Sequence, residues 1–187
     1  DEDLDELIEQ QAAAVLQDRD RSLVMELVYG VLRRQETVDW RLAAVLDKPL
    51  HKLPVVIQMV LRLGAHQLLF LDRIPASAAV NETVLLARAK AKKLGRDWSG
   101  LVNGVLRNLL RLPVPPFPDR ENDPAHALSV QYGLPVWLVE RWMDVVGRER
   151  VTVVVVNDHD HGFVLRAFEG LLGLREGTLR PIDDLAN

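Results

Sequence analysis

Helical periodicity runs through most of this chain and limits what it can fold into. In residues 18–34, apolar side chains recur at the i, i+1, i+4, i+5, i+8 spacing of one helix face. Similar patterns predict helices over 4–16, 37–46, 54–71 and 98–112, whereas strand signals are nearly absent before residue 150. Helices that each carry one apolar stripe must bury it against one another, so the pattern predicts an all-α bundle.

The longest apolar run, residues 53–71, has the length of a membrane-spanning helix but not its composition. A spanning helix needs about 20 residues with almost no charge. This run carries four polar or charged side chains in its interior: Gln58, Arg62, His66 and Gln67. We interpret it as a buried core helix, with His66 hydrogen-bonded inside the core, and we expect no membrane partner.

Two features bear on the location of the protein. Residues 1–10 contain six acidic residues and no basic residue, a composition that a secretory signal peptide does not have. Cysteine is absent, which removes disulfides, thiolate metal sites and cysteine nucleophiles and fits a reducing compartment. The sequence therefore favours a cytoplasmic protein.

Positive charge is concentrated in one stretch of a mildly acidic chain. The formal net charge is −4, yet residues 1–20 sum to −7 and residues 88–111 sum to +6. From Pro75 onward the pattern predicts a helix with an inward apolar stripe, formed by Val80, Val84, Ala87, Ala91 and Leu94. Its other side carries five bases: Arg88, Lys90, Lys92, Lys93 and Arg96. This basic helix is a candidate track for a phosphate backbone, and a merely solvated lysine-rich face is the alternative.

A proline-rich stretch divides the chain. Residues 113–124 contain five of the ten prolines and predict a stiff, extended linker, because proline fixes φ and lacks an N–H donor. We place the domain boundary there, after one helical domain over 1–112. The segment 125–187 begins with two short helices and continues with strand-like runs at 151–158 and 162–168. It is predicted to be the partial start of a second domain, of α+β character.

Three blocks of the helical domain are distinctive, namely RSLVMELVYGVLRRQETVDWRLAAVL (21–46), VLRLGAHQLLFLDRIPASAAVNETVLLA (60–87) and LVNGVLRNLLR (101–111). They resemble the NusB-like helical domain, above all the version that opens the Sun/RsmB family of ribosomal RNA cytosine-5 methyltransferases. A fourth block, LSVQYGLPVWLVERWMDVVG (128–147), is similar to the segment that comes after that domain in the methyltransferases. The resemblance covers about residues 15–150 and implies a NusB-like bundle.

The resemblance implies the RNA-binding N-terminal region of a methyltransferase that acts on small-subunit ribosomal RNA and uses S-adenosylmethionine in a separate α/β domain. In the family two cysteines act in that domain, whereas this chain has no cysteine and no glycine-rich loop after a strand. We therefore assign no catalytic residue and expect this chain alone not to catalyse. Two other interpretations stay open. One is a NusB-type transcription antitermination factor that binds RNA and a ribosomal or transcription protein, and the other is a helical protein-interaction module.

The candidate RNA-binding residues combine the basic helix with bases elsewhere in the helical domain. NusB-like domains resemble one another in using basic residues near their early helices for RNA, and Arg19 and Arg21 match that location. Local pairing with Asp18, Asp20 or Glu26 is the alternative for these two arginines. The complete set is Arg19, Arg21, Arg33, Arg34, Arg88, Lys90, Lys92, Lys93, Arg96 and Arg107.

Other chemistry-bearing residues favour structural roles. The run NDHDHG (157–162) alternates His and Asp, but no further His or Cys pair completes a tetrahedral set, so no metal site is expected. Asn81 and Asn103 lie in mostly apolar helices, where bridging backbone groups is the commoner role. The tryptophans could stack on bases, but they sit at helix starts or on apolar faces and are interpreted as packing residues: Trp40, Trp98, Trp137 and Trp142.

Overall fold

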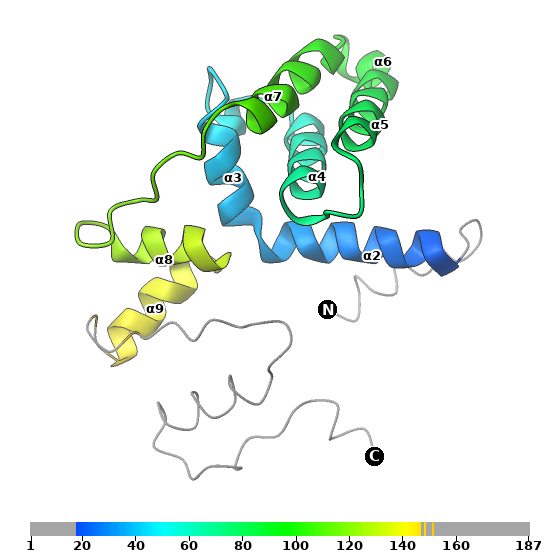
Figure 1. Ribbon diagram of the computed structural model, residues 1–187. Coiled ribbons are helices and arrows are strands. Elements are labelled where there is room, and N and C mark those ends of the chain that lie inside the picture. The colour runs from blue at the N-terminus through cyan, green and yellow to red at the C-terminus, as the bar shows by residue number, and fades with distance from the viewer. Residues whose placement is uncertain (1–17, 147, 149–150, 152–187) are drawn as a thin grey trace. The chain divides into compact units, whose positions relative to one another are not determined.

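The computed structural model describes residues 18–146, 148 and 151, and every regular element among them is a helix (Figure 1). The all-α prediction is therefore confirmed for the described part of the chain. The predicted helix over 4–16 and the strand-like runs at 151–158 and 162–168 lie outside the described residues, apart from Val151. In chain order the elements are α2 (Asp18–Arg33), α3 (Gln35–Ala43), the 3-10 turn η1 (Leu50–Lys52), α4 (Val55–Phe70), α5 (Ala76–Ala89), α6 (Ala91–Leu94), α7 (Ser99–Arg111), α8 (Pro124–Tyr132) and α9 (Val136–Val146).

The core of the bundle forms around α4, which packs against α2, α3, α5 and α7. Ile57, Leu61 and Ala65 on α4 have no exposed surface, and Leu42 of α3 and Leu106 of α7 are equally buried against them. Full burial of each large aliphatic side chain contributes roughly 1.5–3 kcal/mol. The prediction of a core helix in this part of the chain is confirmed. Among the described residues, no helix combines the length and the apolar character that a membrane crossing would require.

Gly64 lets α4 approach its two neighbours closely. A Cβ atom at Gly64 would lie 2.8 Å from side-chain atoms of both Leu106 on α7 and Thr83 on α5. The Thr83 hydroxyl donates a 2.7 Å hydrogen bond to the Ala79 carbonyl of its own helix, so this buried polar group is satisfied. The three helices can therefore pack tightly at this point without an unpaired hydroxyl in the core.

His66 occupies the space that Gly30 leaves between α4 and α2. Its side chain is only 3% exposed, and its ring centroid lies 5.2 Å from that of Phe70. A Cβ atom at Gly30 would overlap the imidazole Nε2. Burial lowers the pKa of His66 to about 4, and the nearby charge of Arg34 is a smaller cause. The core position is as predicted, but His66 Nδ1 has no hydrogen-bond partner among the described residues, so the expected hydrogen bond is missing at this atom.

Polar contacts attach α3 to the helices on either side of it. Arg62 of α4 donates two hydrogen bonds, each 2.7 Å, to the two carboxylate oxygens of Asp39. Thr37 Oγ1 donates to the Val130 carbonyl of α8 at 2.7 Å. The 37–46 pattern suggests Thr37 as an N-cap, but α3 begins at Gln35 and the hydroxyl bonds to a distant segment.

The proline-rich stretch runs along the bundle to α8. Trp40 of α3 stacks on Phe117, with ring centroids 4.8 Å apart and planes inclined by 15°. Beyond it α8 packs against α3, and the compact unit that begins with the bundle ends at Pro135. The helix α9 belongs to the second unit. The division between the two units therefore falls after Pro135, later in the chain than the boundary predicted at 113–124, because α8 packs against α3. The assignment of 125–187 to the start of another domain stays a prediction.

Candidate nucleic-acid interface

A basic corner forms where α5 gives way to α7. The helix α5 ends at Ala89, and Lys90 links it to the single turn of α6. The predicted continuous basic helix is therefore broken, because the Lys90 N–H turns to the Ala87 carbonyl three residues back. Gly95, with a φ of 66°, then reverses the chain ahead of α7, at the far end of α5 from α2 (Figure 1). We define the basic corner by its four exposed cations: Arg88, Lys90, Lys93 and Arg96.

One carboxylate lies next to the basic corner, and the backbone holds it. Asp97 accepts a 2.8 Å hydrogen bond from the Ser99 amide at the start of α7. This bond is the main reason that the pKa of Asp97 is lowered, and the charge of Arg88 contributes less. Asp97 therefore interacts mainly with the N-terminus of α7, where a negative charge is favourable, and its single charge leaves the four cations with an excess of positive charge.

Two more contacts orient arginines along α7. The Arg96 guanidinium carbon lies 4.5 Å from the ring centroid of Trp98, a cation–π arrangement that restrains the side chain. Arg107 Nε donates a 2.9 Å hydrogen bond to Asn103 Oδ1 one turn earlier. Asn103 thus contacts the side chain of a candidate RNA-binding arginine, and not the backbone groups that we expected it to bridge. Lys92 belongs to α6, but its side chain lies outside the described part of the structure.

The arginines of α2 lie elsewhere on the bundle. The helix α2 packs beside the loop that leads into α5, whereas the basic corner lies at the other end of α5 (Figure 1). A 14-residue helix is about 20 Å long at 1.5 Å per residue. Arg88, Lys90, Lys93 and Arg96 therefore lie within nine residues at one end of α5, and the structure does not bring the α2 arginines to them. The candidate set divides into two surfaces.

The individual arginines of α2 differ in their surroundings. Arg34, just after the helix, places its guanidinium 4.6 Å from the Phe70 ring centroid. Arg21 is partly buried, and its Nε has no hydrogen-bond partner among the described residues. Arg33 is exposed in the last turn, and the side chain of Arg19 is not described. Glu26, which we considered as a local partner for Arg19 and Arg21, pairs instead with Arg73 of the loop before α5.

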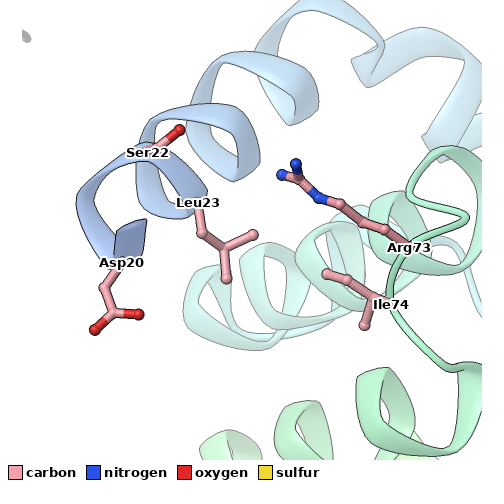
Figure 2. A pocket seen from close by; sticks show the side chains of 5 residues that line it. All are labelled: Asp20, Ser22, Leu23, Arg73 and Ile74. Carbon is pink, nitrogen blue, oxygen red and sulfur yellow. The ribbon is translucent and has the colours of Figure 1, made fainter. Parts of the chain in front are cut away.

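A pocket of about 320 Å³ lies between α2 and that loop. Figure 2 shows Leu23 and Ile74 extending into it from opposite elements, with Arg73 beside them and Asp20 at its edge. One acid and one base line this pocket, so it has no excess of positive charge. It is therefore a weak candidate for binding a polyanion.

A second pocket, of about 440 Å³, opens beside the basic corner. It lies between the loop and turn over 45–53 and the face of α7 that carries Leu101, Gly104, Val105 and Asn108. Its apolar wall includes Leu46, Leu53 and Leu101. We call it the basic pocket, because three cations, Lys48, Lys52 and Arg96, line it against one carboxylate, Asp47. Trp98 and Asn108 are also in its lining.

Lys48 and Lys52 are the functional candidates that sequence reasoning missed. They lie more than 40 residues before Arg96 in the chain, and both lie outside any periodic helix pattern. Trp98 was interpreted as a packing residue, and it is partly buried, yet it also lines the basic pocket. No short-range signal marks this pocket, because it exists only once the 45–53 segment packs beside α7.

The chemistry that this arrangement supports is the binding of anions. Cations with little compensation, a stacked guanidinium and a lined pocket are what a nucleic-acid backbone and a base require. In the part of the chain that the structure describes, no three His, Asp or Glu side chains come together as a metal-binding group. The run over 157–162 lies outside that part.

Comparison with known proteins identifies the family of the chain. The model of the NusB family matches residues 1–111. The chain is 40% identical over 134 residues to a probable ribosomal RNA small subunit methyltransferase B of Bacillus subtilis (strain 168), covering 72% of this chain and 29% of the relative. It is 39% identical over 129 residues to the Synechocystis protein of the same description, covering 69% and 28%. It is 37% identical over 130 residues to the ribosomal RNA small subunit methyltransferase B of Pseudomonas putida, covering 67% and 29%. The chain therefore spans less than a third of the length of these relatives and matches their N-terminal part.

Proposed function

This chain belongs to the NusB family, and from that premise we propose that it is the RNA-binding N-terminal region of a methyltransferase that acts on small-subunit ribosomal RNA. The basic corner is the observation that carries the proposal. Four exposed cations lie within nine residues, and Asp97, the carboxylate that follows them in the chain, is hydrogen-bonded to the start of α7. Such a cluster gains affinity for RNA by releasing the counterions that surround the phosphates.

In this proposal the helical bundle supplies affinity, and a catalytic domain supplies the chemistry. A second, weak contact raises the effective concentration of an active site near its target base. The proposed full protein methylates carbon 5 of a cytosine in the cytoplasm, with S-adenosylmethionine as the methyl donor. The described residues contain only helices and their connections, and they do not include the strand and glycine-rich turn that such a cofactor requires. We therefore assign no residue of this chain to the cofactor.

A free-standing antitermination factor and a protein-interaction module are the competing interpretations. The names of the relatives favour the methyltransferase context. The exposed cations of the basic corner favour a nucleic-acid partner over a protein partner.

A salt titration tests the proposal. The 187-residue chain is titrated with a ribosomal RNA hairpin at rising salt concentration, and binding is followed by fluorescence anisotropy. If the basic corner contacts four phosphates, the plot of log K against log salt should have a slope of about −3 to −4, at roughly 0.7–0.9 per contact. No detectable binding at ~50 mM salt would refute RNA binding and favour the protein-interaction module.

A further inference from the structure

We propose that the basic pocket holds one unpaired nucleotide of the bound RNA while the basic corner contacts the phosphates of the same strand. This inference rests on the proposed function and names the ligand of one part of that surface. Arg96 belongs to both the pocket and the corner, so the two surfaces are continuous. A strand that crosses the corner therefore passes the mouth of the pocket.

The size and charge of the pocket fit a nucleotide. Its volume of about 440 Å³ lies within the ~300–1,000 Å³ of typical small-ligand sites. Lys48, Lys52 and Arg96 give the pocket three positive charges, which only Asp47 opposes. Cations on the polar side can pair with the phosphates on either side of an inserted nucleotide, and the apolar wall can receive the base.

The pair of Arg96 and Trp98 supplies a flat surface for that base. The guanidinium lies over the indole at 4.5 Å, and Arg96 is exposed, so its planar group is held in place at the surface. Bases stack on arginine planes as well as on aromatic rings. Asn108 adds an amide that can hydrogen-bond to a base edge. A base inside a duplex already has both faces stacked and its edge paired, so the pocket should select an unpaired nucleotide.

An acidic protein segment could also satisfy the three cations. It would leave the stacked guanidinium and the apolar wall without a matching planar group, so a base fits the lining better. The probe that binds distinguishes the two occupants.

Two glycines of α7 give a matched pair of variants. Gly104 lines the basic pocket, and Gly100 does not, yet a Cβ atom at either glycine would meet no atom within 4 Å. In Gly104→Leu the new side chain occupies part of the pocket next to Asn108 and obstructs it, whereas Gly100→Leu makes the same change one turn away. Both variants should keep or raise the melting temperature, since leucine favours a helix more than glycine does.

The experiment compares two short, blunt-ended RNA duplexes that are identical except for one bulged nucleotide. We expect the wild-type chain and Gly100→Leu to bind the bulged duplex about fivefold more tightly or better, the lower end of what one base stack provides. Gly104→Leu should bind both duplexes equally, with the affinity of the wild type for the paired one.

The other possible results distinguish failure of the pocket from failure of RNA binding. The pocket is refuted, but RNA binding is not, by any of three results. These are a preference for the bulged duplex that persists in Gly104→Leu, one that is lost in Gly100→Leu, or one that is absent in the wild type. Failure of the wild type to bind either duplex at ~50 mM salt would refute the proposed function as well. If a glutamate-rich peptide binds the wild type and not Gly104→Leu, and no bulge preference exists, the pocket belongs to an acidic protein segment.

Discussion

Charge reversal at the basic corner is the most direct test of the proposed interface. In the variant Lys90→Glu with Lys93→Glu, two of the four described cations become carboxylates. Each lost phosphate contact should make the slope of log K against log salt less steep by about 0.7–0.9. The slope of about −3 to −4 should therefore lose roughly half of its magnitude. Affinity for a ribosomal RNA hairpin at ~100 mM salt should fall by about tenfold or more, because the new carboxylates also repel the backbone.

The same variant should remain folded. Lys90 and Lys93 are exposed, and surface substitutions usually change the free energy of unfolding by no more than about 0.5 kcal/mol each. Both residues lie near helix C-termini, where a glutamate opposes the helix dipole, so a small loss of stability is expected. Thermal unfolding followed by circular dichroism checks this, and RNA binding is measured by fluorescence anisotropy at four or five salt concentrations.

A second variant controls for net charge. Arg120→Glu with Arg141→Glu makes the same change in charge at two residues outside the basic corner and the basic pocket, since Arg120 lies in the turn before α8 and Arg141 on α9. We expect this control to keep most of the wild-type affinity. Equal losses in the two variants would mean that only the overall charge matters, and unchanged binding in the lysine variant would remove the basic corner from the interface.

Three predictions concern the bundle. Folding lowers the pKa of His66 from 6.5 to about 4, so between pH 6.5 and pH 4 the imidazole takes up a proton when the protein unfolds. The stability that the neutral, buried His66 contributes is therefore full above pH ~6.5 and is lost as the pH falls toward 4. Urea unfolding measures this. Between pH 7.5 and pH 5, the free energy of unfolding of the wild type should fall by about 2 kcal/mol more than that of His66→Gln, and equal decreases would contradict the lowered pKa. Gly133→Ala should lower the free energy of unfolding by about 2 kcal/mol, because φ is 72° and the new Cβ would lie 2.7 Å from a backbone carbonyl. Gly104→Ala, in the interior of α7 where a Cβ meets no atom within 4 Å, should raise it by about 0.5–1 kcal/mol in the same denaturation assay. A double-mutant cycle on Asp39 and Arg62, each changed to alanine, should give a coupling of about 1–3 kcal/mol, and a value near zero would show that solvent screens the pair.

The helices could be predicted from sequence because their signal is local. Apolar spacing within 18–34 and 54–71 is set by 3.6 residues per turn, and α2 and α4 match these ranges to within one residue at each end. The prediction of Thr37 as an N-cap failed for the opposite reason. Its hydroxyl bonds to Val130, 93 residues away, and no local pattern carries that information.

The candidate site also has one part that local sequence predicts and one part that only the packing of distant segments creates. The cations from Arg88 to Arg96 are close in sequence, so a single helical pattern was enough to group them. Their joining with Lys48 and Lys52 depends on how the 45–53 segment packs beside α7. The α2 arginines carried the same kind of signal as the basic corner, yet the length of α5 separates them from it. Charge can thus be read from sequence, whereas its arrangement on a surface requires the fold.

The basic corner and the basic pocket would contribute different things to a tethered enzyme. Non-specific phosphate contacts typically give dissociation constants of about 10⁻⁴ to 10⁻⁶ M at physiological salt, and a short tether supplies an effective concentration of about 1 mM. The tethered bundle would therefore occupy RNA at least about tenfold more often than not. Phosphate contacts alone also allow a protein to slide, because they carry no sequence information. A pocket that accepts only an unpaired nucleotide removes that freedom, since the strand can then settle only where a base is free to enter. Under this proposal the basic corner would supply affinity, and the basic pocket would fix the position at which a tethered catalytic domain meets the RNA.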